Sequence, residues 1–318
     1  MRLEEMTEAY IAFRQSIGEK FLTNAVVLRS FVRHTGASAY PKELTVKTCS
    51  DFIYAPHGRL TANSRIKYGA LKGMFEWAVV RGLMGDMPLP VDKPRRLEYI
   101  VPYIYSKEEL RRIFDATLAY QVKRNGSKAC PECVQSVLKI TYFLGLRISE
   151  TMGLRISDLH MDESYAYIHK SKFYKSRLVP FNAQVHKMID AFLRWRIKQG
   201  WPCDGETYLF LNKDHTRMQT PRLRCIFKCI RGVAGISRND GAAFQPRLHD
   251  LRHSFAVHRL NSWYKQGVDV QKALPKLSTY LGHRNLADTS VYLTMTDDLL
   301  SEANALFENY KNIKKTRL

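Results

Sequence analysis

The segment Leu281-Gly-His-Arg-Asn-Leu-Ala-Asp-Thr-Ser-Val-Tyr292 places a histidine, His283, nine positions before a tyrosine. On its own this spacing decides nothing. A tyrosine flanked by Val291 and Leu293 is most often a half-buried packing residue. The meaning of Tyr292 therefore depends on the charged side chains that precede it in the chain.

Three earlier segments carry prominent basic side chains. They are Phe143-Leu-Gly-Leu-Arg147-Ile-Ser-Glu150, Lys170-Ser-Lys172-Phe-Tyr-Lys175-Ser-Arg177-Leu-Val-Pro180 and Leu248-His249-Asp-Leu-Arg252-His-Ser-Phe-Ala256. In the third, a histidine and an arginine three positions apart share one face of a helical turn. Each segment alone has an ordinary structural reading: a contact at a helix end, a solvated turn, or a core histidine beside a salt-bridged arginine. Only their combination points to a site.

The composition favours a polyanionic partner. The 318 residues include 50 basic and 30 acidic side chains, a formal net charge of +20. Residues 1–100 hold 15 basic and 10 acidic side chains, and the rest hold 35 and 20. A protein that neutralises phosphates releases counterions, so we expect double-stranded DNA or another nucleic acid as partner. Charge alone leaves a merely soluble basic protein or a membrane-surface binder open.

The cysteines and the apolar pattern indicate a reducing compartment. Six cysteines form no regular framework, so we expect free thiols and a cytoplasmic protein associated with DNA. The acidic start lacks an apolar region and predicts no signal peptide, and no apolar run approaches the roughly 20 residues of a membrane span. Cys130 and Cys133 have zinc-knuckle spacing, with Cys225 and Cys229 as further candidate ligands, but ordinary thiols are the favoured interpretation.

The first ninety residues predict about four helices. Leu3, Met6 and Tyr10 begin a helical repeat of apolar side chains, and Thr45 is a candidate N-cap of a short third helix. The fourth helix shows a basic face that either contacts phosphates or is simply solvated. Its candidate DNA-binding residues are Arg65, Lys67 and Lys72.

Prolines mark a domain boundary. Pro88, Pro90, Pro94 and Pro102 interrupt helix formation and favour an extended chain. Lys93, Arg95 and Arg96 lie among them and are further candidates for DNA contact. We therefore expect a helical domain over residues 1–87, a basic linker over 88–102, and a second domain over 103–318.

The second domain is predicted to be mainly helical with one small sheet. Ser106 and Glu109 form a capping box at a helix start, and the run from 134 to 146 is apolar nearly all round, as in a buried helix. Alternating residues near Tyr165 and a second β segment near Leu178 flank the basic turn from 170 to 177. These features predict a β-hairpin with a charged tip.

In this order and spacing, the four segments resemble the tyrosine recombinases, also called the phage integrase family, which includes the Xer and Cre recombinases. The resemblance covers nearly the whole chain. Residues 1–87 resemble the family's helical, SAM-like core-binding domain, and residues from about 103 resemble its catalytic domain. The resemblance implies a site-specific recombinase or integrase of the kind found in mobile genetic elements.

The resemblance also assigns roles to individual positions. Arg147 and Arg252 match the family's two arginines, and Lys172 matches the lysine of its β-hairpin. His249 and His283 match its two histidines, Tyr292 its nucleophile, and Glu150 the acidic residue that supports the first arginine. Glycines usually flank the hairpin lysine and are missing here, so Lys170 and Lys175 remain rivals of Lys172. Lys175 and Arg177 are also candidates for DNA contact.

The chemistry of DNA cleavage explains these residue types. Two guanidiniums can stabilise the negative charge that develops on an attacked phosphate. A tyrosine hydroxyl is a weak nucleophile at neutral pH, so a histidine must accept its proton, and His249 is the candidate. Lys172 can protonate the leaving 5′ oxygen, and His283 can donate to the phosphate. The resulting 3′-phosphotyrosine conserves bond energy, so we expect no cofactor, no metal and no ATP.

Two other functions compete with recombination. A type IB topoisomerase-like relaxase uses a similar site but reseals the original strand, and the separate N-terminal domain and the tail after Tyr292 favour recombination over it. A catalytically silent DNA-binding regulator could retain the fold, but all six catalytic positions hold chemically competent residues. The resemblance further implies a homotetramer on two DNA sites with inverted half-sites, in which recombination passes through a Holliday junction. A partner recombinase is a further candidate. An amphipathic helix from Asp297 to about Asn312 is expected to dock on a neighbouring protomer or on its own domain.

Overall fold

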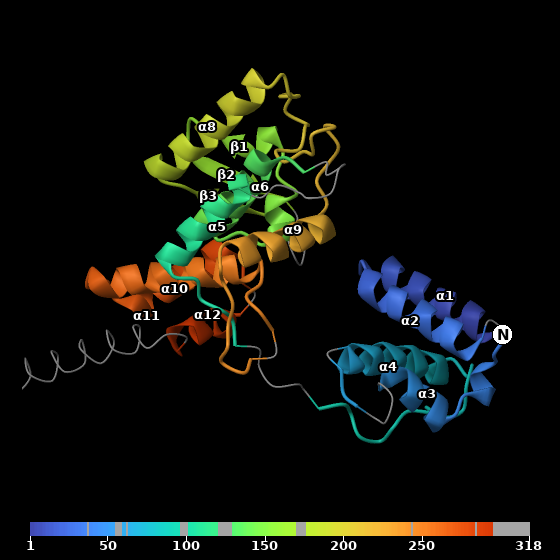
Figure 1. Ribbon diagram of the computed structural model, residues 1–318. Helices are drawn as coiled ribbons and strands as arrows, with labels where there is room; N and C mark the ends of the chain where they lie inside the picture. Colours follow the sequence, from blue (N-terminus) through green and yellow to red (C-terminus); the bar gives the residue numbers. More distant parts are fainter. Residues whose placement is uncertain are drawn as a thin grey trace, which may run out of the picture. The chain divides into compact units, whose positions relative to one another are not determined.

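The computed structural model describes residues 1–36, 38–54, 59–61, 63–95, 101–119, 129–169, 176–242, 244–283 and 285–294. The chain forms two compact units, Met1–Tyr99 and Ile100–Leu318. Both are largely helical, and the described residues contain one small sheet of three strands (Figure 1). The predicted fold class, mainly α with a small sheet, is confirmed. The boundary between the units lies within the segment expected to be the linker.

The N-terminal unit contains the four expected helices. They are α1 (Leu3–Ser16), α2 (Leu22–Thr35), α3 (Val46–Ile53) and α4 (Ser64–Val80), with a short 3₁₀ turn η1 (Pro41–Glu43) before α3. Their apolar faces enclose one core that includes Leu3, Met6 and Tyr10. Thr45 caps α3 as predicted, since its hydroxyl accepts the backbone N–H of Thr48 at 3.1 Å. Helix α4 packs against the other three.

The second unit is built around the buried helix α6 (Pro131–Phe143), which contacts α5 (Lys107–Ala119), α8 (Ala183–Lys198) and α10 (Asp250–Lys265). The predicted capping box at the start of α5 is present: the backbone N–H of Ser106 donates to Glu109 Oε2 at 2.8 Å, and the backbone N–H of Glu109 donates to the Ser106 hydroxyl at 3.1 Å. Helix α9 (Thr220–Val233) packs on α5.

The sheet is antiparallel with strand order β1–β2–β3. Strands β2 (Tyr165–Ile168) and β3 (Arg177–Pro180) form the predicted hairpin, with Ile168 paired with Arg177. Strand β1 (Leu159–His160), which follows the 3₁₀ turn η3 (Ile156–Asp158), was not expected because two residues are too short to show a period. The hairpin tip, residues 170–175, lies outside the described residues.

The last described elements lie together on one side of the second unit. Helix α11 (Val270–Leu281) is followed by the short helices α12 (Ala287–Ser290) and η5 (Val291–Thr294), and α10 contacts both α11 and η5 (Figure 1). A separate apolar cluster fixes this group of helices and includes Leu260, Leu274, Leu281 and Tyr292. This packing brings Tyr292 against α10, far from it in sequence.

Candidate active site

A tight turn brings Arg147 to the site. Helix α6 ends at Phe143, and Gly145 follows with φ +58°, a left-handed conformation that glycine adopts readily. A Cβ atom at this position would lie 2.3 Å from Cδ1 of Phe255 on α10. Arg147 is then the N-cap of α7 (Ile148–Thr151), and its backbone N–H donates to Oε2 of Glu150 at 2.9 Å. The buried helix thus ends three residues before the end of the apolar run predicted from the sequence.

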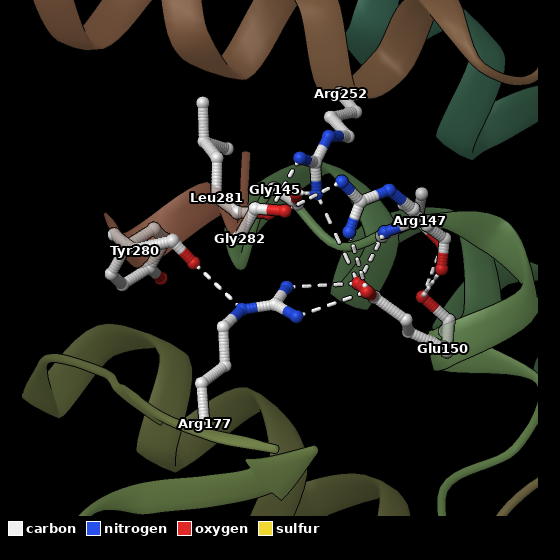
Figure 2. Close-up of polar contacts among 10 residues, drawn as sticks. Gly145, Arg147, Glu150, Arg177, Arg252, Tyr280, Leu281 and Gly282 are labelled. Carbon is white, nitrogen blue, oxygen red and sulfur yellow. Dashed lines mark hydrogen bonds and ion pairs between the residues drawn. The ribbon is translucent and has the colours of Figure 1, made fainter. Parts of the chain in front are cut away.

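Glu150 lies at the centre of three arginines, which we call the arginine cluster: Arg147, Arg177 and Arg252 (Figure 2). Arg177 donates from both terminal nitrogens to the two carboxylate oxygens, each at 2.9 Å, and Arg147 Nη1 donates to Oε1 at 2.8 Å. Burial by itself raises the pKa of Glu150, but the hydrogen bonds and charges of Arg177 and Arg147 outweigh it and lower the pKa to about 2. Glu150 is therefore an anion that holds three cations in place.

The same three arginines cap the end of α11. Each donates to a different carbonyl group of three consecutive residues at that helix terminus (Figure 2). The pairs are Arg177 Nε to Tyr280 at 2.8 Å, Arg252 Nη2 to Leu281 at 2.6 Å, and Arg147 Nη2 to Gly282 at 2.8 Å. Positive charge at a helix C-terminus is favourable, because the last carbonyl groups are unpaired and carry partial negative charge. The arginine cluster thereby ties the start of the His283–Tyr292 segment to the site.

Arg252 is the most deeply placed of the three. Its side chain is 2% exposed, and its Nη1 donates to the carbonyl oxygen of Gly145 at 2.9 Å. Burial, and then the charge of Arg147, lower its pKa to about 10. At neutral pH the guanidinium is still charged, so it keeps its capacity to bind an anion.

Three histidines and the tyrosine form the other half of the site, which we call the histidine cluster: His249, His253, His283 and Tyr292. The ring of Tyr292 lies 5.6 Å from His253 and 6.1 Å from His283 between centroids. Tyr292 as a whole is buried, with 3% of its surface exposed. Nδ1 of His283 is 2.7 Å from the hydroxyl of the buried Thr289. Burial, and then the charges of Arg252 and Arg147, lower the pKa of His283 to about 3, so this ring is neutral at pH 7.

The structure also brings His253, which the sequence reasoning did not single out, to the tyrosine. Its Nδ1 atom is 3.0 Å from the hydroxyl of Tyr292. Among the described residues, His249 has no hydrogen bond to that hydroxyl. His249 is solvent-exposed at the N-cap of α10 and packs edge-to-face on His253, with ring centroids 4.7 Å apart. A signal was present, because His253 follows His249 by four positions and so lies on the same helical face.

The other predicted site residues are placed as follows. Lys172, with its rivals Lys170 and Lys175, lies outside the described residues, as does Arg96. Arg177 is directed into the arginine cluster, so its contact with DNA remains a prediction. Arg65, Lys72, Lys93 and Arg95 are exposed in the N-terminal unit, and Lys72 Nζ lies 3.4 Å from Glu76. Lys67 donates to the carbonyl oxygen of Phe52 at 2.6 Å and lies over that ring.

The described part of the chain shows neither a metal-binding cluster nor a membrane-spanning helix. No group of three or more His, Cys, Asp or Glu side chains there is arranged to hold a metal ion. Cys130 and Cys133 are buried, whereas Cys225 and Cys229 are exposed on α9. None of the described helices is long and apolar enough to cross a bilayer.

Comparison with known proteins identifies the family. Residues 105–298 match the Phage integrase family. The putative integrase/recombinase y4rE of Sinorhizobium fredii is 33% identical over 302 residues, which cover 95% of this chain and 94% of that protein. The tyrosine recombinase XerC of Bacillus pumilus is 27% identical, over 82% of this chain and 75% of that protein. The lambda integrase tetramer bound to a Holliday junction shares the fold with a TM-score of 0.68 and 15% identity, covering 94% of this chain and 78% of that one.

The chain therefore belongs to the phage integrase family and is a tyrosine recombinase, an enzyme that cleaves and rejoins DNA strands. The resemblance seen in the sequence is confirmed at the level of family and activity.

Proposed function

We propose that this enzyme recombines DNA at specific sites by attack of the Tyr292 hydroxyl on a phosphodiester, which forms a 3′-phosphotyrosine and releases a 5′ hydroxyl. The observation that carries the proposal is that Tyr292 lies beside the rings of His253 and His283, on a segment whose start is held by the arginine cluster. A phosphate bound by the arginines would lie beside a nucleophile and neutral histidines. The freed 5′ hydroxyl of another strand then reverses the attack and joins new partners.

Arg147 and Arg252 are proposed to bind the non-bridging oxygens of the attacked phosphate. Each guanidinium has five N–H donors. The described hydrogen bonds of Arg252 occupy Nη1 and Nη2 once each, through Gly145 and Leu281, so further donors remain. Because Glu150 and the carbonyl groups of α11 already fix these side chains, little reorganisation is needed when charge develops on the phosphate.

Lys172 is proposed to protonate the leaving oxygen, and His283 and His249 are proposed to contact the DNA. Lys172 on the hairpin donates a proton to the departing 5′ oxygen. His283 engages Thr289 through Nδ1, which leaves Nε2 for the phosphate. His249 is exposed at the start of α10, and we propose that it meets the DNA from the solvent side. No step in this scheme requires a metal, ATP or another cofactor.

Assembly is proposed to follow the family pattern. The helical unit (1–87), the linker (88–102) and the catalytic domain (103–318) would clamp a duplex, and four subunits on two sites with inverted half-sites would pass through a Holliday junction. The shared fold with the lambda integrase tetramer on such a junction supports this view. An enzyme acting on genomic DNA would work in the cytoplasm at the nucleoid, alone or with a partner recombinase.

Replacement of Tyr292 by Phe tests the central step. With a nicked duplex selected by binding from a randomised pool, wild-type protein should become covalently attached to DNA, and Tyr292→Phe should bind the duplex but form no adduct. Adduct formation by the variant would place the nucleophile elsewhere.

Cleavage by the wild-type protein should be unchanged in EDTA, because the proposed scheme uses no metal. Activity that is lost in EDTA but restored by zinc or magnesium would contradict the metal-free scheme.

Truncation after Thr296 tests the assembly. We expect the shortened protein to bind single sites as tightly as the full chain but to lose cooperative pairing of two sites, because the expected helix over 297–312 would no longer link protomers. Gel-shift and sedimentation measurements on one-site and two-site duplexes report both properties. Undiminished assembly by the truncated protein would rule out the linking helix.

A further inference from the structure

The hydroxyl of Tyr292 has a defined contact on the protein side. The Nδ1 atom of His253 lies 3.0 Å from it, a normal hydrogen-bond distance for an imidazole and a phenol. His253 stands on the first turn of α10, the helix that also carries Arg252. The short helix η5, which packs on α10, brings Tyr292 to this ring. The contact therefore joins two elements that pack against each other in one apolar cluster.

His249 and His253 differ in exposure and in contacts. His249 is exposed at the N-cap of α10, whereas His253 lies one turn deeper and is half-buried. The two rings meet edge-to-face, 4.7 Å between centroids at 87°. His249 is thus open to an incoming phosphate, and His253 faces the nucleophile. A division of labour between the two histidines follows from these positions.

We propose that His253 is the residue that accepts the proton of Tyr292 during DNA cleavage, a refinement that rests on the proposed phosphotyrosine mechanism. The Tyr292 oxygen forms a bond to phosphorus while its proton moves to Nδ1 of His253, giving an imidazolium. The bond from phosphorus to the 5′ oxygen breaks, and that oxygen takes a proton from Lys172. Rejoining runs in reverse, and His253 returns the proton to Tyr292.

The electrostatics of the free protein keep His253 neutral, so that it is able to accept a proton. Burial, and then neighbouring positive charge, lower its pKa to about 3, so the ring is neutral at pH 7. The groups that surround it are His249, Arg247, Arg252, His283 and Tyr292. A bound DNA phosphate cancels part of the positive charge and raises the proton affinity of the ring. Proton transfer is thereby favoured when the substrate is in place.

A matched pair of variants separates this role from packing. On the same helix, Nδ1 of His258 is 2.8 Å from the hydroxyl of Tyr142, a second histidine–tyrosine pair outside the proposed catalytic residues. Glutamine can accept a hydrogen bond but cannot take up a proton at neutral pH. His253→Gln and His258→Gln therefore make the same change, and only the first touches the nucleophile.

The experiment measures single-turnover cleavage of the selected nicked duplex, and of the same duplex with sulfur replacing the 5′ oxygen at the mapped cleavage position. Sulfur leaves without being protonated, so Lys172→Ala should be slow on the oxygen duplex and fast on the sulfur duplex. His253→Gln should be about 10²-fold slower than wild type on both. His258→Gln should match wild type, and both histidine variants should bind DNA normally.

Two results would overturn the proposal. One is cleavage by His253→Gln within about threefold of wild type on the oxygen duplex. The other is recovery of His253→Gln on the sulfur duplex, which would place this histidine on the leaving-group side. The parent mechanism is checked separately, since it fails only if Tyr292→Phe still forms adducts. If His253→Gln loses DNA binding, His253→Asn is measured in the same way and judged by the same two results.

Discussion

The arginine cluster and the histidine cluster lie side by side and are held by different forces. Glu150 and the carbonyl groups of α11 fix the arginines through ionic hydrogen bonds. The histidines are neutral, since burial and the nearby cations lower the pKa values of His253 and His283 to about 3. One half is thus organised to hold an anion, and the other to exchange protons with a nucleophile. The comparison teaches that the two halves are electrostatically coupled, because the cations that would bind a phosphate also help to keep the histidines neutral.

After loss of the nucleophile itself, removing a guanidinium should have the largest effect on cleavage. Arg252→Ala deletes a donor to the proposed oxyanion, so we expect the cleavage rate to fall by about 10²- to 10³-fold. Single-turnover trapping on the nicked duplex measures it. Arg194→Ala is the control, because Arg194 is exposed and pairs with Asp190 on the surface, where such pairs contribute little. Similar rates for Arg252→Ala and the control would refute the role of the arginine cluster.

Removing the central carboxylate should have the largest effect on stability. Glu150→Gln leaves Arg177 and Arg147 without their anion, so we expect the free energy of unfolding at pH 7 to fall by about 3–5 kcal/mol. Urea unfolding followed by circular dichroism measures it. Glu206→Gln is the control, because Glu206 pairs with Arg155 at an exposed position.

The pH dependence sharpens this test. The pKa of Glu150 is lowered from 4.5 to about 2 in the folded protein. A lowered carboxyl pKa contributes stability above the unfolded value, and that contribution is lost as pH falls through the folded value. The stability difference between wild type and Glu150→Gln should therefore shrink between about pH 4.5 and pH 2, by ~3 kcal/mol. A difference that does not change over this range would show that the carboxylate is not held by the arginines.

Substitution of Gly282 or Gly267 by alanine should have the smallest effects on stability and cleavage among these variants. Gly282 and Gly267 both have φ +68°, so alanine at either site should cost about 1 kcal/mol of stability. Around Gly267 an added Cβ meets nothing within 4 Å, but at Gly282 it would lie 3.0 Å from Nη1 of Arg177. Only Gly282→Ala should also slow cleavage, by several-fold, because it displaces the arginine cluster. Equal cleavage rates for both variants would mean that this contact does not affect the site.

Much of the fold was readable from the sequence because its signals are local. The caps at Thr45 and Ser106, the buried run from 134 to 146 and the hairpin strands each depend on neighbours within a few positions. Strand β1 was missed, since two residues carry no period. The ordered spacing of the four motifs also identified the family without any structural information.

The division of labour within the site could not be read in the same way. Arg177 was assigned to DNA contact from its place in a basic segment, but its pairing with Glu150 depends on how β3 faces the turn after α6. His249 was assigned as the proton acceptor because it matches a family motif, and His253 was not considered. Which ring reaches Tyr292 depends on the packing of η5 on α10, which sequence spacing does not specify.

Direct identification of the DNA-linked residue tests the account most sharply. Wild-type protein trapped on the nicked duplex is digested with protease and nuclease, and the peptide that carries a nucleotide is sequenced by mass spectrometry. The account predicts a single modified residue, Tyr292, joined to a 3′ phosphate. A nucleotide on any other side chain, or a linkage through a 5′ phosphate, would contradict it.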